Sequence, residues 1–310
     1  MTNFFELIDQ TNKLIQQFTD NNNRILDLYL KHNVSQYQII KDTIELSKGS
    51  APQRTEEWYK LRGTCITASD VGAFLGIDKY KSQKKAIEVK SGLAKTHYGN
   101  KYTSWGNKYE EIASKIYEKM FNVKIYEAPL LIHPIYPFIG ASCDGFVIDE
   151  KNKHGYLIEI KCPLARKLTD SIPEHYISQP RTQMEVVKAD RCDFFECKLE
   201  EYSNHHEFIA DRSTEYKGFI ISYGFFHEVD SNGISKQYFL YPDNIFDRDH
   251  IPLIERAKNI ENSINVKPIF WKLVEYRNHT LERDPQWLKD NVRILENCWN
   301  KIVELKNEKN

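Results

Sequence analysis

Residues 139–163 read IGASCDGFVIDEKNKHGYLIEIKCP, two apolar segments separated by the polar, glycine-containing stretch DEKNKHG. This pattern predicts two strands joined by a hairpin loop. Because side chains alternate between the two faces of a strand, Ile158 and Ile160 point one way, and Glu159 and Lys161 point the other. An unpaired ion in an apolar interior is costly, so chains seldom bury one without a partner. We therefore expect Glu159 and Lys161 to face a charged partner, at one end of a sheet whose other face is buried.

Asp144 lies on the first of these strands, and the hairpin brings it beside Glu159 and Lys161. A hard divalent cation such as Mg²⁺ prefers carboxylate oxygens and water, and it would neutralise the two acids. A bound metal lowers the pKa of its water, and Lys161 would orient or activate that water for attack on a phosphodiester. The alternative is a buried ion pair with a structural role alone, and the spacing of three residues does not decide between the two.

The whole chain has the composition of a soluble globular protein: 310 residues, 41% of them hydrophobic and 28% charged. It contains no run of about 18 apolar residues, and its first residues, MTNFFELIDQTNK, lack the basic and apolar segments of a signal peptide. We therefore expect an intracellular protein of the cytoplasm or nucleus, with no membrane segment. The net charge of −1 argues against indiscriminate coating of nucleic acid, and the six cysteines are expected to be reduced.

Apolar spacing divides the chain into three parts. Residues 1–48 show helical spacing, which the stretch SKGSAP interrupts. The segment from Arg54 predicts a helix, a short connection and a second helix starting near Ser69, and Gly106–Phe121 predicts a further helix. Strand-like segments follow, and helical spacing returns from Ile251 onward. We expect an N-terminal helical extension over 1–50, a mixed α/β core over 51–245 and a C-terminal helical extension over 246–310.

Four segments resemble, in the same order, motifs of the lambda exonuclease and YqaJ viral-recombinase branch of the PD-(D/E)XK nucleases. They are WYKLRGTCITASD, WGNKYEEIA, GASCDG and IEIKCP, and the resemblance covers roughly residues 54–200. Four motifs in order are far more specific than the acid–acid–lysine triplet alone. The resemblance implies an α/β (α+β) fold, with a PD-(D/E)XK, restriction-endonuclease-like core whose central mixed sheet is flanked by helices, and helical N- and C-terminal extensions.

The resemblance assigns a role to each member of the triplet. Asp144 and Glu159 match the metal-binding carboxylates and Lys161 matches the catalytic lysine, while the backbone carbonyl of Ile160 is expected to complete the metal shell. Glu110 matches an additional acid at the site. Helical spacing places Glu110 at the edge of an apolar stripe, so that it faces the sheet. The alternative for Glu110 is a solvated first-turn glutamate favoured by the helix dipole.

In the family, the arginine of W-x-K-L-R and the serine of ITAS bind the 5′-phosphate of the DNA end. They correspond here to Arg62 and Ser69, and Ser142 matches another phosphate-contacting position. Ser69 is also expected to begin a helix whose free N–H groups attract an anion, and Arg62 would clamp the same phosphate with two hydrogen bonds. A plain N-cap is the alternative role for Ser69, and the two roles are compatible.

The sequence departs from the family pattern after the CP dipeptide. The family helix that reads Q-x-Q is represented by QPRTQ, so Gln179 or Gln183 is expected to supply the glutamine contact, and Arg181 becomes a DNA-binding candidate. Pro180 predicts that this helix begins there and not earlier. The basic residue that the family carries after the CP dipeptide has two candidates here, Arg166 and Lys167.

Together these observations predict a Mg²⁺-dependent DNA exonuclease that hydrolyses phosphodiester bonds in the 5′-to-3′ direction from 5′-phosphorylated duplex ends, with Mn²⁺ as a substitute. The resemblance implies a role in DNA recombination or repair, of viral or phage type, with a single-strand annealing protein as partner and a homo-oligomer in the form of a ring-shaped trimer. Two alternatives stay open. One is a structure-specific or restriction-like DNA endonuclease, and the other is a catalytically inactive DNA-binding scaffold of the same fold.

Overall fold

The computed structural model describes residues 35–94, 100–225, 228 and 236–308. A helix over residues 35–46 precedes the labelled elements. In chain order these are α2 (Glu56–Arg62), β1 (Ile66–Thr67), α3 (Ala68–Phe74), α4 (Gln83–Lys90), α5 (Lys101–Phe121), β2 (Lys124–Tyr126), β3 (Leu131–Ile132), β4 (Ile139–Ala141), β5 (Gly145–Asp149), β6 (His154–Lys161), α6 (Glu174–Val187), β7 (Arg191–Glu201), α7 (His205–Ala210), β8 (Lys217–Phe225), β9 (Tyr238–Leu240), α8 (Ile251–Lys258), β10 (Ser263–Glu282) and α9 (Trp287–Asn307). The expected mixed α/β fold is confirmed.

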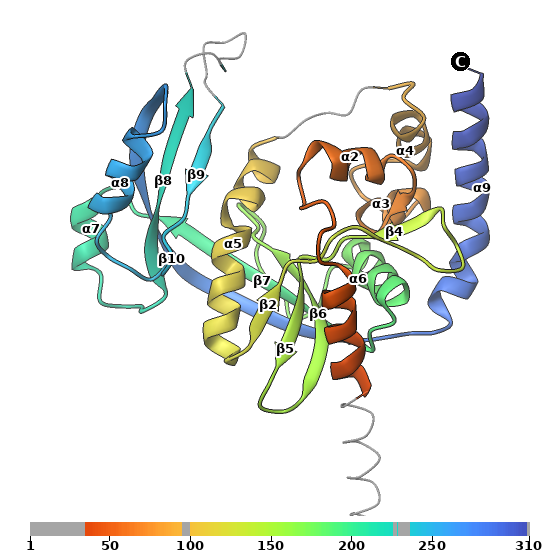
Figure 1. Cartoon of the computed structure of the whole chain (residues 1–310), viewed down its shortest axis with the longest axis horizontal. Helices are drawn as coiled ribbons and strands as arrows, with labels where there is room; N and C mark the ends of the chain where they lie inside the picture. The colour runs from red at the N-terminus through yellow and green to blue at the C-terminus, as the bar shows by residue number, and fades with distance from the viewer. Residues whose placement is uncertain (1–34, 95–99, 226–227, 229–235, 309–310) are drawn as a thin grey trace, which may run out of the picture.

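A seven-stranded sheet in the order β2-β5-β6-β7-β10-β8-β9 organises the fold. β6 and β7 are parallel, and the other neighbouring pairs are antiparallel, so the sheet is mixed as expected. A smaller sheet, β1-β4-β3, lies to one side. Figure 1 shows β8, β9, α7 and α8 gathered in a lobe at the left, with α2, α3, α4, α6 and α9 at the right. β10 runs between these two regions, pairing with β8 through its first half and with β7 through its second.

Helices cover both faces of β6. Ile158 and Ile160 pack in one core cluster with residues of α5, such as Ile112. Leu157, on the opposite face, packs in another cluster with Met184 of α6. Strand alternation therefore places Glu159 on the α6 side. Six consecutive residues of β6 are buried, so both faces of this strand are enclosed, where the sequence predicted one buried face.

α5 is the long helix that carries the predicted acid at its centre. Asn100 caps its start, because the side-chain Oδ1 accepts hydrogen bonds from the backbone N–H groups of Tyr102 and Thr103, each at 3.0 Å. Asn122 ends it in the left-handed conformation, with φ 53°. The predicted apolar stripe is confirmed by its buried residues, Tyr109, Ile112, Ala113, Ile116 and Tyr117. The helix begins at Lys101, five residues before the predicted Gly106.

α6 differs from the sequence prediction, because it begins at Glu174 and contains Pro180 in its interior. A proline there removes one backbone hydrogen bond and normally interrupts a helix. Packing outweighs that loss here, since eight residues of α6 are buried, Pro180 and Met184 among them. The prediction that the helix starts at Pro180 was wrong for that reason.

The C-terminal segment is helical in part. α8 and α9 confirm the helical spacing around Ile254 and Leu295, and α9 packs in a core cluster with α3, α4 and α6. Residues 263–282, however, form β10, which is inserted between β7 and β8. This segment, SINVKPIFWKLVEYRNHTLE, is rich in β-branched and aromatic residues that favour strands. The prediction of helix throughout 246–310 was therefore wrong for the segment between α8 and α9.

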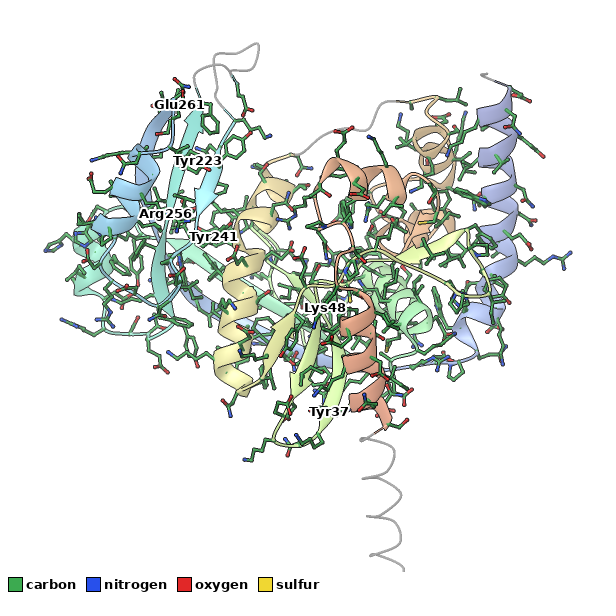
Figure 2. All side chains as sticks on the ribbon, viewed as in Figure 1. Tyr37, Lys48, Tyr223, Tyr241, Arg256 and Glu261 are labelled. Carbon is green, nitrogen blue, oxygen red and sulfur yellow. The ribbon has the colours of Figure 1, made fainter. Side chains whose placement is uncertain are left out.

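The helix over residues 35–46 covers the β5–β6 hairpin. Ile40 is fully buried, and a Cβ on Gly155 would lie 2.8 Å from the Cβ of Ile40. Figure 2 labels Tyr37 at this hairpin, where its hydroxyl donates to Glu150 Oε2 at 2.6 Å. This confirms helix in part of the predicted N-terminal extension, and residues 1–34 lie outside the described residues. The described helices include none that is both long and apolar enough to span a membrane. All six cysteines are free thiols.

Candidate active site

Glu159 is a buried carboxylate with both oxygens engaged. Its Oε1 forms an ion pair with the Lys161 ammonium, and its Oε2 accepts a hydrogen bond from Gln183 Nε2 at 2.6 Å. The Glu159 side chain is 1% exposed and the Lys161 side chain is 25% exposed. The lysine therefore lies between the buried acid and solvent, where a ligand can reach it.

The hairpin brings Asp144 to the same place, as predicted. Gly145, the first residue of β5, pairs with Ile158 of β6, so Asp144 lies opposite the end of β6. The backbone N–H of Ile160 donates to Asp144 Oδ2 at 2.6 Å. The structure thus places Asp144, Glu159, Ile160 and Lys161 together, and the metal-binding role of the Ile160 carbonyl stays a prediction.

Glu110 reaches the site from α5. It lines a pocket of about 520 Å³ together with Asp144 and Arg54. Arg54 Nη2 lies 2.6 Å from Glu110 Oε2, and the Glu110 side chain is 30% exposed. The sequence-based interpretation that Glu110 faces the sheet end is therefore confirmed in its geometry. Further pocket-lining residues are Asn107, Glu111, Glu118, Glu127 and Tyr241.

The carboxylates repel one another. Burial raises the pKa of Asp144 well above its usual value, and the charges of Glu159 and Glu110 raise it further. Burial also raises the pKa of Glu110, which Arg54 opposes and Glu159 reinforces. Burial works against the charged form of Lys161, but Glu159 and Asp144 outweigh it and raise the pKa of the lysine. Lys161 is therefore an ammonium at neutral pH.

This donor set fits a hard divalent cation in its chemistry. Repulsion among Asp144, Glu159 and Glu110 is what a cation would relieve, and carboxylate oxygens are the ligands that Mg²⁺ prefers. Within the described residues, no three His, Cys, Asp or Glu side chains stand close enough to form a ready metal cluster. Glu159 and Glu110 are instead held by Lys161 and Arg54.

Both glutamines of α6 contact the triplet. Gln179 Oε1 accepts a hydrogen bond from Lys161 Nζ at 3.3 Å, and Gln183 Nε2 donates to Glu159 Oε2. The two residues are one helical turn apart, so they lie on the same face of α6. The sequence left open which glutamine makes the contact. Because α6 begins at Glu174, both glutamines lie on the helix and both contact the triplet.

The predicted phosphate-binding residues also lie together. Arg62, at the end of α2, donates from Nη2 to Ser69 Oγ of α3 at 3.1 Å. The Arg62 guanidinium lies 4.5 Å from the centre of the Trp58 ring, and Trp58 Nε1 donates to Ser142 Oγ at 3.4 Å. Because Ser142 is two residues before Asp144, this chain of contacts links the predicted anion site to the carboxylates. Trp58 is a residue to which sequence reasoning gave no function.

The three predicted basic residues of the downstream segment separate. Arg166 forms an ion pair with buried Glu196, and its guanidinium lies 5.5 Å from the centre of the Tyr176 ring, which Lys161 approaches to 5.8 Å. Lys167 is exposed to solvent. Arg181 pairs with Asp284 at 3.0 Å, just before α9, and so points to the C-terminal segment. Arg166 is thus the candidate that lies beside the triplet.

Sequence reasoning missed three further residues around the site. Arg54 pairs with Glu110, Tyr176 lies under both Lys161 and Arg166, and Glu196 holds Arg166. The parallel pairing of β6 with β7 sets Glu196 beside Lys161, and long-range strand pairing of this kind leaves no local signal. Tyr176 precedes Gln179 by three residues, so helical spacing is the signal that would have pointed to it.

Comparisons with known proteins agree with the sequence resemblance. The model of the YqaJ-like viral recombinase domain matches residues 57–190. An uncharacterized protein of Acanthamoeba polyphaga mimivirus is 26% identical over 291 residues, covering 81% of this chain and 52% of that protein. The uncharacterized protein YqaJ of Bacillus subtilis is 29% identical over 148 residues, covering 46% of this chain and 45% of the other. The chain spans about half the length of these relatives.

The fold is similar to that of an alkaline exonuclease from Laribacter hongkongensis. The TM-score is 0.50 at 21% sequence identity, and the match covers 82% of this chain and 96% of the other. At this identity the likeness shows the shared fold and leaves the chemistry to the residues described above.

Proposed function

We propose that this chain, whose residues 57–190 match the YqaJ-like viral recombinase domain, is a divalent-metal-dependent DNA exonuclease acting on 5′-phosphorylated duplex ends. The observation that carries the proposal is the continuity of two sites. Arg62 and Ser69, which we propose as the anion site, are linked by contacts through Trp58 to Ser142, two residues before Asp144. A phosphate at the first site would hold a DNA end while the next phosphodiester lies over the carboxylates.

In this proposal Asp144, Glu159 and Glu110, with the Ile160 carbonyl, hold Mg²⁺ or Mn²⁺. When bound, the ion supplies Lewis-acid polarisation of the phosphodiester and a water of lowered pKa. Lys161, protonated and directed by Glu159 and Gln179, donates hydrogen bonds to the attacking water or to the phosphate. It therefore orients and stabilises, because a protonated lysine has no free lone pair with which to act as a base.

The remaining basic residues extend the proposed DNA contact. Arg166 is held beside Lys161 by its ion pair with Glu196, and its guanidinium lies 5.5 Å from the centre of the Tyr176 ring. It is therefore the candidate for binding a second backbone phosphate. Lys167 and Arg181 are proposed as weaker contacts, since Lys167 is exposed to solvent and Arg181 already pairs with Asp284. By resemblance, we extend the proposal to a 5′-to-3′ direction, a role in viral or phage-like recombination or repair inside the host cell, a single-strand annealing partner and a ring-shaped homotrimer.

The test compares three DNA substrates in Mg²⁺: a linear duplex with 5′-phosphate ends, the same duplex with 5′-hydroxyl ends, and a closed circle. We expect mononucleotide release from the 5′-phosphorylated duplex, slower release from the 5′-hydroxyl duplex, and an intact circle. Efficient cutting of the circle would identify an endonuclease instead. Absence of cleavage in both Mg²⁺ and Mn²⁺, with DNA binding retained, would identify a scaffold.

A further inference from the structure

Arg54 occupies an unusual position at the edge of the site. Its φ of 68° lies in the left-handed region, which favours glycine and is strained for a long side chain. The neighbouring residues fix it there. Gln53 Nε2 donates to the carbonyl oxygens of Ala128 and Cys143 at 2.8 and 3.0 Å, and Thr55 caps α2 through Trp58 N. Strain that anchored neighbours maintain beside a site is a reason to seek a function for the residue.

The Arg54 guanidinium pairs with Glu110 within the pocket. Nη2 lies 2.6 Å from Glu110 Oε2, and Asp144 lines the same pocket. The two paired side chains are 45% and 30% exposed, so water reaches the ion pair and it is weak enough to open. Glu159, by contrast, is buried between Lys161 and Gln183. Glu110 is therefore the carboxylate whose present partner is easiest to exchange.

We propose that Arg54 is an exchangeable counter-ion: it neutralises Glu110 while no divalent cation is bound, is displaced when the cation binds, and then pairs with a DNA phosphate. The inference rests on the proposed metal-dependent function. If a divalent cation and the guanidinium both bound the Glu110 carboxylate, they would lie only a few ångströms apart and would repel each other. A displaced guanidinium at the pocket mouth is suited to a phosphate, which it binds with two parallel hydrogen bonds. Cation binding thus adds a positive charge to the DNA-binding surface.

The first experiment measures Mn²⁺ binding to the DNA-free protein by isothermal titration calorimetry. If Arg54 competes with the ion, Arg54→Gln should tighten Mn²⁺ binding by about two- to fivefold, the upper part of the range expected for removing a partly exposed competing ion pair. Arg54→Lys keeps the charge and should restore weak binding. Arg54→Gly also removes backbone strain, so equal affinities for the Gln and Gly variants would assign the effect to the guanidinium.

Lys115 provides a matched control. It lines the same pocket and pairs with Glu118 at 2.8 Å, so Lys115→Gln makes the same change of charge without touching Glu110. We expect Lys115→Gln to leave the Mn²⁺ affinity within about twofold, as for a partly screened charge. In a Glu110→Gln background, Arg54→Gln should have no further effect. Equal tightening by the Lys115 and Arg54 variants, or no change with Arg54→Gln, would overturn the proposal.

The second experiment measures the salt dependence of DNA binding in a Lys161→Ala background, in which cleavage is expected to be slow enough for binding to be measured first. With Mn²⁺ present, adding Arg54→Gln should reduce the slope of log K against log salt by about 0.9, the value for one lost phosphate contact. Without Mn²⁺ the slope should not change. An equal loss of slope with and without Mn²⁺ would show that Arg54 binds DNA without exchange and would contradict the proposal.

These outcomes separate the inference from the function on which it rests. If wild-type protein binds Mn²⁺ and Asp144→Asn abolishes binding while Arg54→Gln changes nothing, the counter-ion proposal alone is wrong. If wild-type protein binds no Mn²⁺, the metal-dependent function fails and the counter-ion proposal fails with it.

Discussion

The two ends of the seven-stranded sheet differ in how the charged side chains inside the fold are compensated. At the β5–β6 end, half-buried Asp144 lies close to fully buried Glu159, and desolvation together with repulsion raises the pKa of Asp144. At the β8–β9 end, the buried ammonium of Lys217 donates to the backbone carbonyls of Phe208 and Asp211 at the end of α7. The Lys217 ammonium also lies 4.9 Å from the centre of the Phe208 ring and 6.0 Å from the centre of the Tyr202 ring.

The difference shows which buried charges indicate a function. Lys217 is stabilised within the fold, because two backbone carbonyls accept hydrogen bonds from two of its three N–H donors. Asp144 accepts a hydrogen bond from the Ile160 N–H and faces two nearby like charges, which Lys161 offsets only in part, so a cation would complete its environment. Burial of an ionisable group is therefore a weak signal by itself, and unrelieved repulsion among buried carboxylates is a stronger one.

The largest effect is expected from removing the ammonium at the β5–β6 end. Lys161→Ala should lower the cleavage rate by about 10²- to 10³-fold, the usual cost of removing one preorganised donor that stabilises the transition state. Steady-state digestion of 5′-phosphorylated duplex would measure it, with DNA binding by anisotropy as a check that the site is intact. Lys272→Ala is the matched control, because Lys272 of β10 lies 3.5 Å from Asp211, in the other end of the sheet. A comparable loss of cleavage rate in the Lys272→Ala variant would contradict the assignment of catalysis to the β5–β6 end.

The next effect concerns the anion site. Arg62→Ala should reduce the preference for 5′-phosphate over 5′-hydroxyl ends by about 10- to 100-fold, because charged hydrogen bonds contribute about 1.5–3 kcal/mol. The ratio of kcat/KM for the two substrates measures this preference directly. An unchanged ratio would show that Arg62 has a structural role, through its contacts with Ser69 and Trp58, and does not bind the 5′-phosphate.

Two glycines provide a paired test of stability against activity. A Cβ at Gly218 would lie 1.9 Å from the backbone oxygen of Ile245, so Gly218→Ala should destabilise the fold by about 1–3 kcal/mol or more. At Gly145 the closest obstacle, at 2.2 Å, is the Ile125 methyl Cγ2, which a rotamer change can move. Gly145→Ala should therefore cost less stability but more activity, because Gly145 adjoins Asp144. Thermal melts measure the stability of both variants, and cleavage per folded molecule measures their activity. A larger loss of stability in Gly145→Ala, or a larger loss of activity in Gly218→Ala, would contradict the prediction.

The smallest effect is expected where the N-terminal helix meets the hairpin. Tyr37→Phe removes the hydrogen bond to Glu150 and should cost about 0.5–1.5 kcal/mol of stability. Cleavage should be unaffected, since this contact lies at the turn of the β5–β6 hairpin and the site lies at its other end. Urea denaturation measures the stability, and a loss of activity without a loss of stability would contradict this separation.

The sequence was most informative where structure is local. Alternation in LIEIK and the polar loop before it predicted the hairpin that joins Asp144 to Glu159, and the apolar stripe of α5 predicted which of its faces is buried. The register of a hairpin follows from a few adjacent residues, so these predictions needed no knowledge of the rest of the chain.

What the sequence could not supply depends on distant segments. Insertion of β10 between β7 and β8 is decided by pairing between segments far apart in the chain, from Ser263 with Phe225 to Glu282 with Arg191, for which a single sequence holds no direct signal. Pro180 predicted a helix start because the backbone hydrogen bond that a proline removes can be inferred from the sequence alone. The packing of α6 that outweighs this loss cannot be inferred in that way. The positive φ of Arg54 was also hidden, because neighbours on other elements impose it.

The central claim is that Asp144 and Glu159 together hold a divalent cation beside Lys161. Anomalous diffraction from crystals soaked in Mn²⁺ tests it most directly. The account predicts a strong anomalous peak bridged by the carboxylates of Asp144 and Glu159, which disappears in crystals of Asp144→Asn. A peak elsewhere in the chain, with these two carboxylates unliganded at saturating Mn²⁺, would contradict it.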